Sequence, residues 1–318
     1  MKVTVVGAGG NVGSTVAYSI AERDFAKEVI MVDLEKKEGD KTFYPSKGRA
    51  LDQWETAPIA GFDTRLTGTT DYELTENSDV CVITAGVPRR PGMSRDDLLE
   101  INSKIVKSVT EQLVKYSPDT VIIVVSNPLD VMTYVAYTSS GLPSTKVMGM
   151  AGILDTARYR AFLAEELDIS PKDIQALLMG GHGDTMVPLP RYTTVSGIPV
   201  TQLIDSEKLN KIVDRTKKGG GELVGLMGTS AWYAPGAAAA QMAEAIILDQ
   251  NRIFPCAVLL DGEYGIRDLF LGVPVKLGKG GIKKIIEVDL NSEEDELLRA
   301  SEKAVRSTLD DFKKLMDK

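Results

Sequence analysis

The sequence predicts an α/β protein with an amino-terminal doubly wound parallel sheet and a carboxy-terminal α+β domain. Up to about residue 150, short apolar strands alternate with helical stretches, as in a parallel sheet covered by helices. Beyond that point, strands separated by polar turns indicate antiparallel pairing. The chain has 318 residues and exceeds the roughly 250–300 at which a single core usually divides. We therefore expect two domains, residues 1–150 and 151–318.

The first strand runs directly into a glycine-rich turn. Residues 2–6 form an apolar run typical of a buried parallel strand, and Gly7-Ala8-Gly9-Gly10-Asn11-Val12-Gly13 follows at once. A helix over 14–22 and a second strand over 28–32, which ends at Asp33, come next. The order of strand, glycine turn, helix, strand and acid is typical of the Rossmann dinucleotide-binding layout.

The spacing of the glycines gives a turn with one residue more than the usual GxGxxG pattern. We interpret it as Gly7-x-x-Gly10-x-x-Gly13, with Asn11 and Val12 beside the bound nucleotide. Glycine lets backbone N–H groups approach a pyrophosphate at a helix N-terminus, where the helix dipole favours negative charge. A glycine turn alone is also compatible with a purely structural bend. The context, and above all the acid that follows, favours a nucleotide.

Asp33 predicts which nucleotide binds. It lies twenty residues after Gly13, at the end of the second strand. A carboxylate at that place accepts both hydroxyls of an adenosine ribose and repels a 2′-phosphate. The sequence therefore favours NAD over NADP, although Lys36 and Lys37 lie close by in the sequence.

The remaining elements of the first half lead to a loop rich in arginine. We expect a helix near 47–56 and strands over 63–67, 79–85, 121–125 and 147–150. The strand over 79–85 ends at Gly86, and a loop with Arg89, Arg90 and Arg95 precedes a helix over 96–116. Guanidinium groups pair with carboxylates in a bidentate way, so this loop is a candidate lid for an anionic substrate. The alternative is a solvated basic loop. Asn127, which follows the strand over 121–125, is a further candidate at the ligand edge of the sheet.

His182 is the only histidine of the sequence. Imidazole is the one side chain whose ordinary pKa places its charge change between roughly pH 5 and 8, so any near-neutral proton shuttle built on imidazole has a single candidate. Glycines on both sides leave room for a substrate and a cofactor to approach the ring. The strand expected over 175–179 places His182 at a strand end. The alternative is a structural histidine.

The second half contains one further pair of interest. Asp155 and Arg158 lie three residues apart in a helix expected over 153–167, so they share one helix face. By itself, this spacing indicates a surface ion pair that contributes little to stability. Only proximity to His182 would give the pair a role in a site. The other expected elements are a hairpin over 191–199, helices over 206–218 (ended by a bend at 219–221) and 236–248, strands over 252–260, 269–277 and 285–288, and a last helix capped by Ser292 whose apolar stripe is Leu298, Val305, Leu309, Phe312 and Met316.

Composition excludes several classes of protein. A net charge of −8 argues against a nucleic acid or an anionic membrane as the main partner. Cys81 and Cys256 lie in apolar runs and are expected to be buried thiols, and one histidine without a CxxC pair leaves no zinc cluster. No secretory signal and no apolar run of about 20 residues is present in the sequence, so we expect a cytoplasmic protein.

Taken together, the motifs resemble one family. The turn 7–13 with Asp33, the loop 88–95, Val125-Ser126-Asn127-Pro128, Leu154-Asp155-Thr156-Ala157-Arg158 and the stretch 180–184 occur in the order seen in lactate/malate dehydrogenases. The resemblance covers nearly the whole chain, and it is nearest to malate dehydrogenases of the lactate-dehydrogenase-like type. It implies an NAD-binding Rossmann domain over 1–150 and a catalytic domain over 151–318.

The resemblance also implies a role for each matched residue. His182 matches the proton-transfer histidine, and Asp155 matches the carboxylate that orients it. Arg158 matches the arginine that binds the C1 carboxylate of the substrate. Arg95 matches the lid arginine that polarises the C2 oxygen, and Asn127 matches a side chain that forms a hydrogen bond with the substrate. Asn102 and Val125 match cofactor contacts. Arg89 matches the residue that sets specificity, where lactate dehydrogenases carry glutamine.

An arginine at position 89 favours a dicarboxylic substrate. A buried guanidinium that faced a methyl group would be an unpaired charge, whereas a second carboxylate would pair with it. The expected reaction is therefore reversible hydride transfer between (S)-malate and NAD, with a homodimer or homotetramer as the implied assembly. The alternatives are a dehydrogenase of lactate or another 2-hydroxy acid, and, from a different class, a non-catalytic NAD-binding protein.

Overall fold

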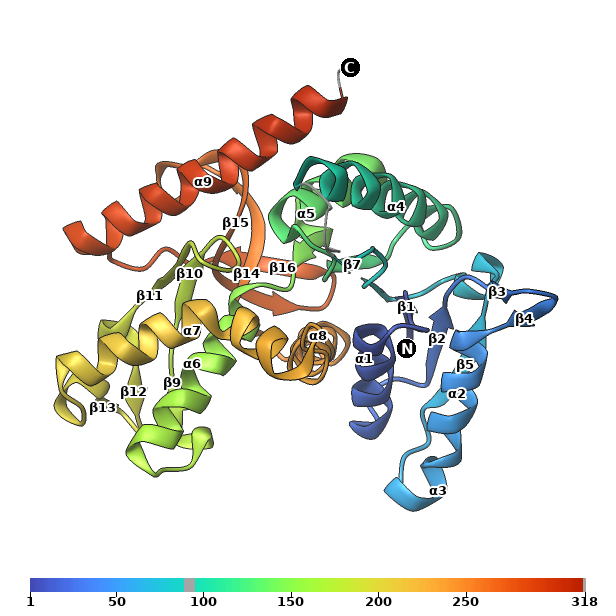
Figure 1. The fold of residues 1–318 in the computed structure, drawn as a ribbon, viewed down its shortest axis with the longest axis horizontal. Helices are drawn as coiled ribbons and strands as arrows, with labels where there is room; N and C mark the ends of the chain where they lie inside the picture. The colour runs from blue at the N-terminus through green and yellow to red at the C-terminus, as the bar shows by residue number, and fades with distance from the viewer. Residues whose placement is uncertain (89–94, 317–318) are drawn as a thin grey trace.

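The computed structural model describes residues 1–88 and 95–316. Within them, one sheet of eleven strands takes strands from both halves of the chain. Figure 1 shows how these strands and the helices around them are arranged. The strand order of the sheet is β11-β10-β15-β14-β8-β7-β6-β1-β2-β5, with β16 paired to β15. The predicted fold class, a Rossmann half followed by an α+β half, is confirmed.

The first half of the sheet is parallel. Its strands are β1 (Lys2–Val6), β2 (Glu28–Val32), β5 (Arg65–Thr69), β6 (Val80–Ile83), β7 (Val121–Val124) and β8 (Val147–Gly149). Most of their side chains are buried because helices cover both faces, which explains the near-continuous apolar runs. The helices of this half are α1 (Asn11–Glu22), α2 (Pro45–Glu55), α3 (Ala57–Ala60), α4 (Arg95–Tyr116) and α5 (Leu129–Ser140).

The second half continues the sheet with antiparallel strands. The long hairpin of β14 (Arg252–Asp261) and β15 (Arg267–Gly278) meets the parallel half where Ala257 pairs with Gly149. The other strands of this half are β10 (Leu178–Gly180), β11 (Met186–Pro188) and β16 (Gly281–Ile285), and a small separate sheet holds β9 (Ile174–Gln175), β12 (Thr194–Val195) and β13 (Ile198–Pro199). The helices are α6 (Gly152–Leu167), α7 (Ser206–Met227), α8 (Tyr233–Ile247) and α9 (Ser292–Met316).

Two hydrophobic cores lie among the described residues. The larger one covers both faces of the long sheet and takes side chains from both halves of the chain. The smaller one lies beneath α6 and α7, which pack side by side, and includes Tyr159, Leu163 and Ile174. In the part of the chain that the structure describes, no helix is long and apolar enough to cross a membrane.

The structure corrects several boundaries. The bend expected at 219–221 is wrong, because α7 continues through the three glycines to Met227. The strand expected over 175–179 divides into β9 and β10, which belong to different sheets. The strand expected over 285–288 is wrong, because β16 ends at Ile285. The polar stretch before α2 contains a hairpin of β3 (Lys36–Glu38) and β4 (Lys41–Phe43).

The cap of the last helix also differs from the prediction. Asn291, rather than Ser292, is the capping residue, because its Oδ1 accepts the backbone N–H of Glu294 at 2.8 Å. Glu294 Oε2 in turn accepts the N–H of Asn291 at 3.0 Å, which makes a reciprocal capping box. The predicted stripe is buried except for Met316, which is 48 % exposed near the helix end.

Candidate active site

His182 lies two residues after β10 and meets a carboxylate from α6. Its Nδ1 lies 2.9 Å from Asp155 Oδ2, and the side chain of Asp155 is only 2 % exposed. Arg158, one helical turn along α6, donates from Nη1 to Asp155 Oδ1 at 3.3 Å. The predicted helix-face pair is thus part of a buried cluster with His182. Because Nδ1 faces Asp155, Nε2 is the ring nitrogen left to meet a substrate.

The cluster favours the protonated imidazole. Burial by itself lowers the pKa of His182, but the carboxylate of Asp155 and, to a smaller extent, that of Asp130 outweigh burial and raise this pKa above its ordinary value. Arg158 acts in the opposite direction. An imidazole in such surroundings gains a proton readily and holds it against a carboxylate, as a general acid–base must.

A cavity of about 510 Å³ connects His182 with the glycine-rich turn. Val12, Val125 and Asn127 line it from the parallel half, while Arg158 and His182 line it from the second half. The carboxyl ends of the parallel strands and the α6 cluster therefore open on the same space. In the sequence these residues belong to four separate stretches, and the fold brings them together.

The glycine turn at the start of α1 is compact. Gly10 N–H donates to Gly7 O at 3.0 Å, and a side-chain carbon at Gly13 would lie 2.5 Å from Gly7 O, so position 13 requires glycine. Gly10 is the N-cap of α1 and makes no side-chain cap bond, and the first turn holds no acidic residue. The backbone N–H groups of this helix end, Asn11 among them, therefore suit an anionic group such as a pyrophosphate.

Asp33 faces this turn from the end of β2. Its Oδ2 accepts the N–H of Gly9 at 2.7 Å, and its Oδ1 accepts the N–H of Leu34 at 2.7 Å. The carboxylate is therefore fixed beside the turn, at the place where a ribose would follow a pyrophosphate. Together with the open helix end, it gives a donor and acceptor set that fits a dinucleotide.

Asn102, predicted as a cofactor contact, lies on α4 and is buried. Its Nδ2 donates to Asn127 O at 2.7 Å, and its Oδ1 accepts the N–H of Val87 at 2.8 Å. It thus ties the start of the arginine loop to the end of β7. Arg89 lies outside the described residues. Arg95 begins α4, and nothing is described of its side chain.

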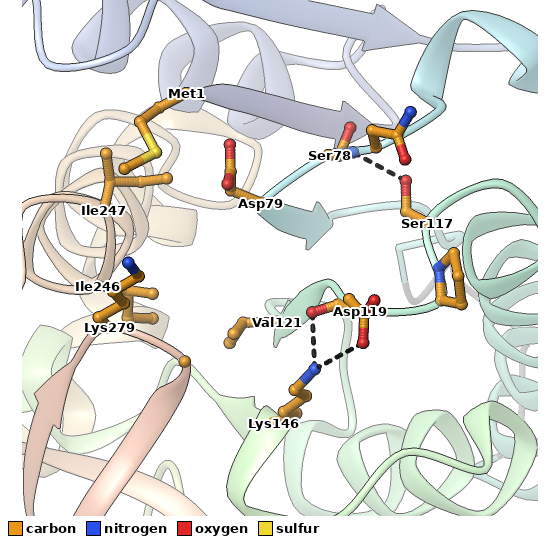
Figure 2. A pocket seen from close by; sticks show the side chains of 13 residues that line it. Met1, Ser78, Asp79, Ser117, Asp119, Val121, Lys146, Ile246, Ile247 and Lys279 are labelled. Carbon is orange, nitrogen blue, oxygen red and sulfur yellow. Dashed lines mark hydrogen bonds and ion pairs between the residues drawn. The ribbon is translucent and has the colours of Figure 1, made fainter.

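A second hollow lies at the opposite edge of the sheet. Figure 2 shows it at the amino ends of β6 and β7, and its volume is about 300 Å³. Lys146 donates to the backbone oxygen of Asp119 at 2.8 Å, and Ser117 accepts the N–H of Ser78 at 2.9 Å. These polar groups satisfy one another at the edge remote from His182, so this hollow is not the candidate site. Within residues 1–88 and 95–316, no three His, Cys, Asp or Glu side chains gather as a metal site.

Two residues near the site were missed by the sequence analysis. Asp130 enters beside His182 from the first turn of α5, and Arg49 on α2 binds the glycine turn. Asp130 follows Asn127 by three residues, so a search for carboxylates near the strand ends would have found it. Arg49 lies 36 residues after Gly13, and nothing in the sequence pattern indicates that contact.

A parallel sheet that ends at an open helix N-terminus, beside a buried imidazole–carboxylate pair, defines an oxidoreductase of the nicotinamide-dependent dehydrogenase class. The comparisons with known proteins specify the family. Residues 1–149 match the NAD binding domain of lactate/malate dehydrogenase, and residues 153–316 match its alpha/beta C-terminal domain. The chain belongs to the lactate/malate dehydrogenase family.

Individual relatives are similar over their full length. Malate dehydrogenase of Salinibacter ruber is 65 % identical over 317 residues, which covers 100 % of this chain and 98 % of the relative. A solved structure of malate dehydrogenase from that organism matches with a TM-score of 0.93 at 63 % identity, covering 100 % of this chain and 99 % of the other. The lactate dehydrogenase of Cryptosporidium parvum, solved with lactic acid and β-nicotinamide adenine dinucleotide, has a TM-score of 0.91 at 36 % identity, with 98 % of each chain covered.

Proposed function

We propose that this protein is an NAD-dependent malate dehydrogenase that interconverts (S)-malate and oxaloacetate. The observation that carries the proposal is the His182–Asp155 pair, which opens on a cavity that reaches the glycine turn. Such a pair serves proton transfer, and a protein that only binds a nucleotide does not need one. The relatives named malate dehydrogenase, at 50–65 % identity, support the dicarboxylic substrate over lactate.

The proposed cofactor site fits NAD. Gly7, Gly10 and Gly13 with the N-terminus of α1 would hold the pyrophosphate, and Asp33 would accept the ribose hydroxyls. Bound NAD supplies the hydride acceptor for malate oxidation, and NADH supplies the hydride for the reverse reaction. Val12 and Val125 line the cavity between the glycine turn and His182, and their apolar side chains would exclude water there.

The proposed mechanism assigns proton transfer to His182. In oxidation, neutral His182 accepts the C2 hydroxyl proton of malate at Nε2 as the hydride departs. Asp155 holds Nδ1 and stabilises the imidazolium that results. In reduction the imidazolium returns this proton to the C2 oxygen of oxaloacetate.

Arginines position the substrate in this proposal. Arg158 lines the cavity next to His182, where its guanidinium would bind the C1 carboxylate. Asn127 lines the same cavity and would donate a hydrogen bond to the substrate. By the family resemblance, Arg95 polarises the C2 oxygen and Arg89 binds the second carboxylate.

A substrate comparison tests the specificity proposal. We expect purified enzyme with NADH to reduce oxaloacetate much faster than pyruvate, and Arg89→Gln to lower kcat/KM for oxaloacetate roughly 10- to 100-fold by removing a charge-assisted pair. Arg90→Gln is the matched control, with the same change one residue away. An unchanged preference in Arg89→Gln, with loss in Arg90→Gln, would assign specificity to Arg90. Faster turnover of pyruvate by the unmodified enzyme would favour a lactate dehydrogenase.

The proton-transfer pair has its own test. We expect Asp155→Asn to reduce kcat roughly 10²–10⁴-fold, the range that general acid–base catalysis contributes, while the Kd for NADH stays unchanged. Stopped-flow turnover and NADH fluorescence titration measure the two quantities. His182→Gln is the parallel variant, and near-normal turnover in either would contradict the mechanism. Tight NADH binding without oxidation by any 2-oxo acid in the unmodified enzyme would indicate a binding protein instead.

We further propose that the protein is a cytoplasmic homo-oligomer. Large apolar side chains stand exposed on α2, α3 and the start of α8, namely Leu51, Ile59 and Tyr233, and a second copy of the chain would cover them. The free, buried thiols of Cys81 and Cys256 agree with a reducing compartment. Light scattering distinguishes a dimer or tetramer from a monomer.

A further inference from the structure

Asp130 is a buried carboxylate that the proposed mechanism does not use. It is the second residue of α5 and lines a cavity of about 390 Å³ that also has His182 and Asn127 in its wall. The far wall comes from α9, through Ala304, Val305 and Thr308. This cavity adjoins the one that reaches the glycine turn, and the two share Asn127, His182 and Asp184 in their walls.

The carboxylate of Asp130 is held against the histidine loop. A side-chain carbon at Gly181 would lie 3.5 Å from Asp130 Oδ2, so the backbone next to His182 passes close to this oxygen. Asp130 Oδ1 is buried and has no hydrogen-bond partner within the described residues. A buried carboxylate oxygen without a donor is costly, and such groups concentrate at functional sites.

The electrostatics agree with this placement. Burial raises the pKa of Asp130 to about 6, with a smaller contribution from Asp155, while His182 lowers it. The effect is mutual, because Asp130 also favours the charged form of His182. The other charged groups around the two cavities are Asp155 and Arg158 from α6, Asp184 in the shared wall, and Lys217 and Lys218 from α7. The α9 residues that line the cavity are uncharged.

We propose that Asp130 is a positioning residue for the reaction: a second carboxylate that, together with Asp155, stabilises the imidazolium form of His182. The inference rests on the acid–base role proposed for His182. Asp155 holds the ring through Nδ1, and Asp130 adds negative charge from a different element, the start of α5. Two carboxylates then oppose the positive charge of Arg158, so the imidazolium persists beside a guanidinium.

A direct measurement is available because His182 is the only histidine in the chain. With ¹³C-labelled histidine, one imidazole Cε1–H resonance reports its titration in the full-length enzyme. We expect Asp130→Asn, which keeps the shape and removes the charge, to lower the pKa of His182. Asp130→Glu keeps the charge, has the adjoining cavity for its extra methylene, and should restore the pKa.

Asp184→Asn is the matched control. Asp184 is an exposed carboxylate two residues from the ring, where water screens its charge. We expect it to leave the pKa close to that of the unmodified enzyme. An unchanged pKa in Asp130→Asn, or an equal shift in Asp184→Asn, would overturn the proposal. Should Asp130→Asn fail to fold, the titration of His182 in the unmodified enzyme provides the test. Its resonance should show a second inflection near pH 6, where Asp130 gains its proton. A single inflection would contradict the proposal.

Kinetics separates this role from a structural one. Oxaloacetate reduction needs the protonated ring, so Asp130→Asn should move the fall of kcat/KM with rising pH to lower pH and cost roughly three- to tenfold above neutrality. Malate oxidation needs the neutral ring, so the rise of its kcat/KM with pH should also move to lower pH. A uniform loss at every pH would indicate a merely structural residue. Turnover retained by His182→Gln would instead refute the proposed function. The resonance titration would still show whether Asp130 raises the pKa of His182.

Discussion

Arg49 on α2 holds the glycine turn through three hydrogen bonds, and Gln53 of the same helix shares one acceptor, Ser14 Oγ. Arg49 Nε donates to Gly9 O at 2.9 Å, Nη2 to Asn11 Oδ1 at 2.9 Å, and Nη1 to Ser14 Oγ at 3.3 Å. Gly9 is thus bound at both ends, since Asp33 accepts its N–H. These bonds fix the conformation of the turn, including its extra residue. They also place a positive charge beside the helix end that is proposed to bind the pyrophosphate.

We expect Arg49→Met to weaken NADH binding roughly five- to tenfold, because it removes both the charge and the donors that order the turn. Fluorescence titration of NADH gives the Kd. Lys47→Met is the matched control, since Lys47 lies on the same helix with its Nζ 4.6 Å from the centre of the Tyr44 ring. Equal weakening of NADH binding in both variants would mean that the net charge of α2, and not the bonds from Arg49 to the turn, sets the affinity.

Part of the candidate site could be predicted from residue identity and part from local spacing. His182 could be singled out because it is unique, and Asp33 because its distance from Gly13 is fixed by the strand–turn–helix–strand geometry. Asp130 and Arg49 could not be found in this way. Their importance comes from contacts with residues 52 and 40 positions away, His182 and Gly9, which no local spacing encodes.

Among the elements, α7 departs most from its sequence pattern. Three consecutive glycines in a helix interior each cost about 1 kcal/mol relative to alanine, which is why a bend was expected. The helix packs on α6 and buries Leu209, Ile212, Thr216 and Gly219. At the exposed edge of this contact, Arg215 Nη1 lies 2.9 Å from Glu165 Oε2. Arg215 also pairs with Glu222 at 3.0 Å across the glycines. Tertiary contacts thus override the local preference.

Gly219 has a role that the other glycines of α7 lack. A side-chain carbon there would lie 3.2 Å from Arg158 Cδ. We expect Gly219→Ala to displace the guanidinium and raise KM for oxaloacetate roughly three- to tenfold, with a smaller change in kcat. Gly225→Ala, where the added carbon meets open space, should only stabilise the fold by about 0.5–1 kcal/mol. Steady-state kinetics and thermal unfolding check both, and a normal KM in Gly219→Ala would contradict the close fit.

At the scale of the whole molecule, the two halves share a sheet and a core. β14 pairs with β8, and α8 packs against α1 so closely that a side-chain carbon at Gly236 would lie 2.6 Å from Thr15 Cγ2. Arg23 and Glu244 add an ion pair of 2.7 Å across this contact. The boundary at residue 150 stays a prediction about domains, but packing of this kind couples the halves energetically.

We therefore expect one cooperative unfolding transition rather than two. The chain has two tryptophans, Trp54 on α2 and Trp232 before α8, so the variants Trp54→Phe and Trp232→Phe each leave a reporter in one half. Their fluorescence midpoints in urea should coincide with each other and with circular dichroism. Midpoints that separate beyond error would show that the halves unfold independently.

The sequence by itself predicted the Rossmann half, the glycine turn with its acid, and His182 as the one candidate for proton transfer by imidazole, and the family resemblance added Asp155 and Arg158 as candidate site residues. Buried parallel strands and glycine turns have local patterns, so they are readable along the chain. Only the tertiary structure decided that α6, β10 and the strand ends open on one cavity, that α7 passes through its glycines, and that Asp130 stands beside His182. These outcomes depend on contacts between segments far apart in the chain, and the energy of packing them exceeds the local preferences of each.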